Sequence, residues 1–281
     1  MTERWPTLRR WLSLPTTRIG LVLLTIVLAI SIIGPLVWDL DPLTTDAVNG
    51  YASPSGDHPL GTDRLGRDVL ARLLAAGTMS IIAGVAAVGI GAIVGIVIGI
   101  ASGFIGGRFD AVVMRVVDVL LAFPMLLNAL VVIAIIGPSM TGAVIAVSVS
   151  AIAPYARVLR GTVLPIRTAT FVKAARVSNT PLHRMLRVHV LPNVRDVALV
   201  LLVIGAGNGI VVLSALSFLG IGTQPPDADW GVLLTEGVRA VYFVPAAAVA
   251  PAVMLLITVL GINLIGEGLG TTLRTDRRPH A

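Results

Sequence analysis

The residue types that most often carry catalysis, metal binding or nucleotide binding are sparse in this chain. It has no cysteine, which excludes disulfides, thiol catalysis and cysteine-ligated zinc. Its histidines are His58, His183, His189 and His280. They lack the HExxH spacing or a comparable ligand spacing, so metal catalysis is not expected. The only lysine, Lys173, lies outside the Gly-Lys-Ser/Thr pattern of a P-loop, so the chain is not expected to bind ATP, hold a cofactor or act as an enzyme.

The longest strongly polar segment between apolar blocks runs from Phe171 to Asn193. At helical spacing its first half presents one small, flat face. That face consists of Phe171, Ala174, Ala175 and Ser178, with Lys173 and Arg176 beside it. These residue types favour docking against a partner protein over chemistry, because a helix with a small apolar face fits into a groove.

The second half of this segment predicts a turn and another short helix. Asn179 suits the left-handed turn that ends a helix, Thr180 is placed to cap the next one, and Pro181 suits its first turn. The apolar side of this second helix consists of Leu182, Met185, Leu186 and His189. Pro192 is expected to end it. The sequence therefore predicts two short helices that meet at an elbow, and the alternative is an ordinary amphipathic hairpin at a membrane surface.

Membrane spans must position this elbow. The chain has 281 residues, 56% of them hydrophobic and 13% charged, which is typical of a multispanning membrane protein rather than a soluble domain. The first apolar run is too long for a signal peptide and is interpreted as an uncleaved span. Six transmembrane helices are predicted, near residues 19–38, 79–102, 117–137, 141–160, 197–219 and 243–265.

The charge distribution predicts which segments face the cytoplasm. With the amino terminus inside, the inner segments hold seventeen Lys/Arg against six acids, a net charge of +11. The outer segments hold four Arg against nine acids, a net charge of −5. This is the positive-inside bias, so the overall charge of +6 indicates topology rather than nucleic-acid binding. Both termini and the elbow are expected to be cytoplasmic.

The polar stretch 39–76 is expected to be an external loop with an interfacial helix. Leu65, Val69 and Leu73 repeat at helical spacing, and Asp68 and Arg72 lie at i, i+4. A solvated loop that ends in a helix would give the same local pattern. On the other outer loop, Trp230 is interpreted as an ordinary interfacial aromatic residue.

Several residues of the spans bear on packing and movement. Four glycines at a strict four-residue step predict a ridge for close helix packing. They are Gly91, Gly95, Gly99 and Gly103. Arg115 and Asp118 lie one turn apart and are expected to pair. Phe123 and Pro124 mark a predicted kink in the third span, which would act as a gating hinge or would only shape the packing.

The elbow segment resembles the cytoplasmic coupling loop of ABC-transporter permeases. Their pattern is Glu-Ala-Ala, three residues, Gly, nine residues, then Ile-x-Leu-Pro. Here Ala174 and Ala175 match the Ala pair, and His189 takes the Ile position. The pattern ends in Leu191 and Pro192, and Asn193 follows it. Lys173 replaces the Glu, which puts that residue's ion pair in doubt, and Asn179 replaces the Gly but tolerates the same turn.

Other segments are similar to one class of these permeases, the dipeptide, oligopeptide and nickel importers. The outer loop resembles the HPLGTDxLGRDVLSR segment of that class. The matching residues include His58, Gly61, Asp63, Gly66, Arg67 and Asp68. Residues 103–124, 216–231 and 261–269 also resemble segments of this class, although Glu267 stands for Asp and Gly270-Thr271 for Arg-Asp.

The resemblance implies an all-α membrane protein with the type I importer permease fold, divided into four parts. Residues 1–38 form a cytoplasmic N-terminus and first span, and 39–76 form the external loop. Residues 77–268 form the permease domain with the coupling loop at 168–193, and 269–281 form a basic tail. The chain would be a plasma (inner) membrane permease subunit for di- or oligopeptides.

The implied partners are a homologous second permease, two ABC ATPases that hold ATP and magnesium, an external solute-binding protein and membrane lipid, with no nucleic acid. Nickel or another small solute is an alternative cargo. A secondary transporter or channel is a further alternative, which the near absence of ionisable residues in the predicted span cores disfavours.

Overall fold

The computed structural model describes residues 4–276, which are helical with no strand. Apolar residues, many of them Val, Ile, Leu, Ala or Gly, fill the long helices, and glycine or proline marks most of their ends. The elements are α1 (Arg4–Ser13), α2 (Pro15–Val37), η1 (Ala47–Asn49), α3 (Val69–Ile105), α4 (Gly107–Leu121), α5 (Met125–Ile136), α6 (Met140–Thr168), α7 (Thr170–Val177), α8 (Leu182–Met185), the π-helical η2 (Leu186–Val190), α9 (Leu191–Phe218), α10 (Trp230–Ala240) and α11 (Ala246–Asp276). The all-α membrane architecture predicted from the composition is confirmed.

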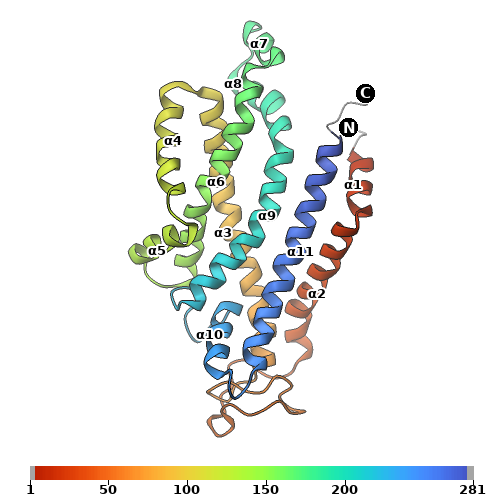
Figure 1. Cartoon of the computed structure of the whole chain (residues 1–281), viewed down its shortest axis with the longest axis vertical. Helices are drawn as coiled ribbons and strands as arrows, with labels where there is room; N and C mark the ends of the chain where they lie inside the picture. The colour runs from red at the N-terminus through yellow and green to blue at the C-terminus, as the bar shows by residue number, and fades with distance from the viewer. Residues whose placement is uncertain (1–3, 277–281) are drawn as a thin grey trace.

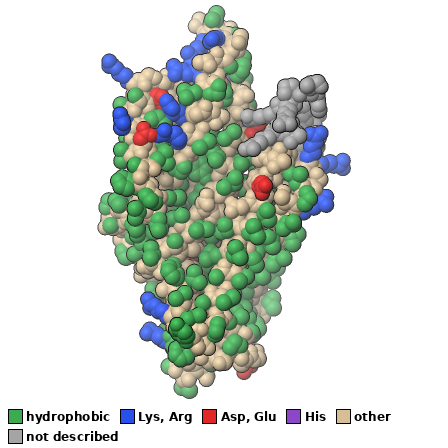
Figure 2. All heavy atoms as spheres, viewed as in Figure 1, with side chains coloured by type: hydrophobic (Ala, Val, Ile, Leu, Met, Phe, Trp, Pro, Cys, Tyr) green, Lys and Arg blue, Asp and Glu red, His purple; other side chains and the backbone are tan. Residues whose placement is uncertain are grey.

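The long helices lie side by side in one bundle with two different ends (Figure 1). We call the end with α7 and α8 the elbow end; α1 and the last described turns of α11 lie there as well. The loop end is the opposite one, formed by residues 38–68 together with the segments that flank α10. Hydrophobic side chains cover the middle of the bundle, and Lys and Arg gather toward the elbow end (Figure 2).

Five helices of the described residues are long and apolar enough to cross a membrane, or six spans if one bent pair counts as a single span. That pair is α4 and α5, which meet at 96° across residues 122–124. The predicted kink at Pro124 is confirmed, but the third span is broken rather than merely kinked. Proline lacks the amide proton that would continue the helix. The Asn128 side chain instead binds the freed Leu120 carbonyl, at 2.7 Å.

The predicted glycine ridge packs α3 against α6. A Cβ atom on Gly91 would lie 2.2 Å from the Ser148 carbonyl oxygen, and one on Gly95 would lie 2.5 Å from that of Ile152. Both distances are far below a van der Waals contact, so only glycine permits this helix separation. The prediction of close packing is confirmed.

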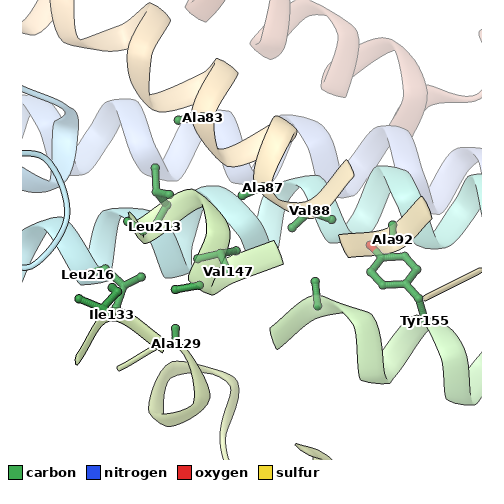
Figure 3. Close-up of a cluster of buried hydrophobic side chains, with 13 residues drawn as sticks. Ala83, Ala87, Val88, Ala92, Ala129, Ile133, Val147, Tyr155, Leu213 and Leu216 are labelled. Atoms are coloured by element: carbon green, nitrogen blue, oxygen red, sulfur yellow. The ribbon is translucent and has the colours of Figure 1, made fainter. Parts of the chain in front are cut away.

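An apolar core fills the space beneath this contact, with side chains from α3, α5, α6 and α9 (Figure 3). Val147 and Leu216 are buried within it, and Tyr155 lies at its edge. The Tyr155 hydroxyl donates to the Leu201 carbonyl of α9 at 3.1 Å, so the one polar group at this edge is satisfied. The core therefore connects the broken α4–α5 span to the helix that continues from the elbow.

The structure has no separate interfacial helix in residues 39–76, contrary to the prediction. α3 begins at Val69 and runs unbroken to Ile105, so the residues expected in that helix form the first turns of a span. The apolar repeat was correct, but no helix breaker separates it from the following apolar run.

Candidate functional site

The elbow forms at the predicted residue. Asn179 has φ +50°, the left-handed conformation that glycine would adopt at this point. Two backbone hydrogen bonds close the turn, from Asn179 N to Arg176 O at 3.1 Å and from Thr180 N to Ala175 O at 3.0 Å. α7 therefore ends in a compact reversal, and the replacement of glycine by asparagine preserves it.

Two predictions about the second half of the elbow are wrong. The residue before α8 is Pro181 and no side chain caps that helix, so Thr180 does not have the predicted capping role. Pro192 does not end the helix, because α8 runs through η2 into α9. The Leu191 amide donates to the Leu186 carbonyl, five residues back. This wider π-helical turn accommodates the proline at the start of α9. The elbow is thus rigidly continuous with a span.

The small face predicted for α7 is divided between two surfaces. Val172 is buried in a cluster with Phe104 of α3, Leu159 of α6 and Met185 of α8, and Ala175 is also buried. Apolar burial of this kind fixes α7 to the bundle. Ala174 and Ser178 are exposed, so only one alanine of the Ala pair is free to contact another protein.

The outer surface of the elbow carries an unpartnered apolar patch. We call it the elbow patch: Phe171, Ala174, Val177, Ser178 and Leu182. Val177 is 85% exposed, Leu182 52% and Phe171 44%. The patch is bordered by exposed basic side chains, namely Lys173, Arg176, Arg184 and Arg187.

Aromatic contacts hold the border of the patch in place. The Phe171 ring lies 5.7 Å from the His189 ring, so the two halves of the elbow touch. The Arg176 guanidinium lies 5.3 Å from the centre of the Phe104 ring, a cation–π contact. Beyond the elbow, Leu191, Pro192 and Asn193 are exposed on the first turn of α9.

Ion pairs that sequence analysis missed hold the helices beneath the elbow. Arg160 of α6 donates two hydrogen bonds, of 2.5 and 2.6 Å, to the carboxylate of Asp110 of α4. Ser102 of α3 donates to the same carboxylate at 2.5 Å. The only sequence signal for these contacts was that the residues involved are expected at the same end of the bundle.

The predicted pair of Arg115 with Asp118 is wrong. Asp118 forms its ion pair with Arg157 of α6 instead. A partner on a neighbouring helix was closer than one on the same helix, and helical spacing alone does not reveal such partners.

The loop end contains a second ion network, formed largely by the predicted motif residues. Arg67 binds Asp63 at 2.6 Å, and Arg72 binds the same Asp63 carboxylate at 2.7 Å. Glu236 of α10 accepts from both arginines and so ties the loop to a helix far along the chain. We call these four residues the loop-end network. Glu236 was not predicted to belong to this network. The only sequence signal for it was that it is an acid in an outer segment, on the same side as arginines that had no predicted partner.

Asp68 does not pair with Arg72, contrary to the prediction. Its carboxylate accepts the Ala71 amide at 2.7 Å and so caps α3. The same carboxylate accepts from Trp38 Nε1 at 3.0 Å, and His58 Nδ1 lies 3.0 Å away. Capping turns the carboxylate toward the helix start and away from the next turn, where Arg72 lies.

The two motif glycines shape the loop around these side chains. Gly61 has φ +77° and Gly66 has φ +74°. A Cβ atom on Gly66 would lie 1.7 Å from the Asp46 carbonyl oxygen, so no other residue fits. The motif is therefore a folded structural unit in which His58, Asp63, Arg67 and Asp68 converge.

Trp230 is not the interfacial aromatic residue that was predicted. Its side chain is 0% exposed, and its indole donates to the Leu73 carbonyl of α3 at 3.2 Å. Asp229, also fully buried, accepts from Ser217 of α9 at 2.5 Å and caps α10. α10 is thus inserted between α3 and α9 instead of lying on a surface.

The described residues contain no group of three or more His, Asp or Glu placed to hold a metal ion. Phe123 and Pro124 lie at the break between α4 and α5, and Phe123 is exposed. Residues of the predicted tail beyond position 276, including Arg277 and Arg278, lie outside the described part of the chain.

Comparison with known proteins identifies relatives over most of the chain. The family described as binding-protein-dependent transport system inner membrane component matches residues 95–277. The dipeptide transport system permease protein of Alkalihalophilus pseudofirmus is 32% identical over 91% of this chain and 84% of its own length. The oligopeptide permease protein of Bacillus subtilis is 32% identical over 94% and 87%. The glutathione permease protein of Pectobacterium atrosepticum is 37% identical over 78% and 73%.

Proposed function

This chain belongs to the family of binding-protein-dependent transport system inner membrane components, and from that premise we propose that it is a permease subunit of an ATP-driven importer of di- or oligopeptides. Relatives named as dipeptide, oligopeptide and glutathione permeases support a peptide cargo. Nickel or another small solute is the second candidate, because the outer-loop motif resembles a class that also includes nickel importers and selection of the cargo would rest with the solute-binding protein.

The observation that carries this proposal is the elbow patch. An exposed apolar surface ringed by arginines, on a short helix fixed to two spans, suits insertion into a groove of another protein. The chain lacks a P-loop, so the energy would come from separate ABC ATPases that hold ATP and magnesium. Closure of the ATPases would push α7 and, through the continuous α8–η2–α9 helix, tilt the spans.

The charge distribution supports an elbow end in the cytoplasm. Of the described residues, the segments at that end carry fifteen Lys/Arg, and the loop end carries four. Positive charge is retained on the cytoplasmic side during insertion. Both termini would then be cytoplasmic, and the loop end would face an external solute-binding protein. A second, homologous permease would complete the translocation pathway.

Isolation of the assembly from its native membrane tests the proposal. The tagged chain is expected to copurify with a second permease, with ABC ATPases and with a solute-binding protein, which mass spectrometry identifies. The purified assembly is expected to import peptides only with ATP. A chain that purifies alone and transports solute unaided would instead indicate a channel or secondary transporter.

A further inference from the structure

All positive charge of the loop end converges on one cavity. This cavity has a volume of about 380 Å³ and lies between the outer loop, the start of α3, α10 and α11. Four arginines line it: Arg64, Arg67, Arg72 and Arg239. Among the described residues, no other Lys or Arg lies on the loop-end segments 38–68 and 219–245. These segments and Arg72 carry a net charge of −5, so the clustering of every cation at one cavity is not a consequence of overall charge.

The four arginines play two different parts. Arg67 and Arg72 are buried and neutralised by Asp63 and Glu236 within the loop-end network. Arg64 and Arg239 are exposed and form no ion pair with any residue that the structure describes. The cavity therefore contains two arginines, Arg67 and Arg72, whose charge is neutralised by the loop-end network. It also contains two guanidinium groups, those of Arg64 and Arg239, that have no ion-pair partner among the described residues.

Free guanidinium groups at a cavity suit a carboxylate. Arginine presents its donors as a planar fork that matches the two oxygens of a carboxylate, and such charge-assisted hydrogen bonds are the strong ones. Three acids also line the cavity, namely Asp63, Asp227 and Glu236. Asp227 is exposed and is not part of the loop-end network, so one negative group is accessible beside the free cations.

The remaining walls are apolar. They include Tyr51, Leu73, Leu233, Ala247 and Pro251. The volume of about 380 Å³ lies within the range of about 300–1,000 Å³ that is typical of small-molecule sites. Apolar walls with accessible charges of both signs fit a small zwitterion that has its own side chains.

We propose that this cavity is a reception site for a short peptide, in which Arg64 and Arg239 bind the free C-terminal carboxylate. The inference rests on the proposed peptide import and adds a binding site within the permease itself. Both arginines are exposed, so the site is expected to bind peptide weakly. Weak binding would let the site accept a peptide and release it to the translocation pathway.

Direct binding to the purified wild-type assembly, without solute-binding protein, tests this site. Saturation-transfer NMR would be recorded with trialanine and with trialanine amide, which lacks the C-terminal charge. Saturable binding of trialanine is expected, with affinity for the amide about tenfold lower, which corresponds to about 1.4 kcal/mol.

Exposed residues provide matched variants that leave the buried network intact. The double variant R64A/R239A is expected to weaken trialanine binding about tenfold, and R64K/R239K to retain most of it. Asp57→Asn, an exposed change on the same loop that does not line the cavity, is expected to have no effect.

Equal binding of trialanine and its amide would overturn the proposal, as would unchanged binding by R64A/R239A. The proposal would also be overturned if R64A/R239A lost docking of the solute-binding protein while direct peptide binding stayed intact. The arginines would then bind a carboxylate of the solute-binding protein and not one of the peptide. ATP-driven peptide uptake by the wild-type assembly is measured in the same preparation. Uptake with no cavity binding would reject only the reception site, whereas absence of uptake would reject the peptide import on which it rests.

Discussion

The same substitution, alanine to glutamate, is expected to have opposite consequences at the two alanines of the elbow. Ala174 lies on the elbow patch, whereas Ala175 is buried. Ala174→Glu adds an exposed carboxylate to a solvated helix, which changes the free energy of unfolding by less than about 0.5 kcal/mol. The same carboxylate would be desolvated without a partner when the patch docks, at a cost of about 3 kcal/mol. Docking is then expected to weaken about a hundredfold.

Ala175→Glu is the matched control, because it places the same charge at a buried position of the same helix. Overpacking alone costs about 1–3 kcal/mol, and burial of the charge adds to this. The thermal midpoint of the purified protein is therefore expected to fall for Ala175→Glu and to stay unchanged for Ala174→Glu. ATP-driven uptake into proteoliposomes is expected to be lost in Ala174→Glu despite normal folding. Normal uptake by this variant, or equal thermal destabilisation by both variants, would refute the division of the face.

Three further changes test the packing, the loop and the turn. Gly91→Ala is expected to lower the free energy of unfolding by about 1–3 kcal/mol in thermal scans, because its Cβ would meet α6. Gly89→Ala on the same helix faces open space and should be neutral; a loss there too would indicate a general helix effect. Asp63→Ala removes the shared partner of Arg67 and of buried Arg72, so a loss of about 3–5 kcal/mol is expected, and unchanged stability would contradict a structural role. Asn179→Val should cost about 1–2 kcal/mol because φ is positive, while Asn179→Gly should be tolerated; chemical denaturation of both variants measures the difference.

Features that depend on one segment could be predicted from the sequence. The spans follow from the length of apolar runs, and the elbow turn follows from Asn179, which tolerates the left-handed region. The glycine ridge is a third example, because its four-residue step places every glycine on one side of a helix. In each case the pattern that reveals the feature lies within one chain segment, although the glycine ridge acts through its contact with α6.

Features that depend on partners far along the chain could not be predicted. Asp68 was expected to pair with Arg72, yet it caps α3, and Arg72 binds Glu236 instead. The roles of Ala174 and Ala175 differ because the fold leaves one of them exposed and buries the other. Trp230 is buried because α10 inserts beside α3, which composition does not reveal.

Site-directed cross-linking tests most directly whether the elbow patch docks on a separate ATPase. The chain has no cysteine, so a single cysteine at Val177 gives a unique reactive group on the patch. Val172→Cys, on the buried side of the same helix, is the control. If the elbow patch docks on an ATPase in the cytoplasm, Val177→Cys in the purified assembly is expected to cross-link to the ATPase subunit and Val172→Cys is not. Absence of a cross-link from Val177→Cys, or its labelling in intact cells by a membrane-impermeant thiol reagent, would rule out this docking.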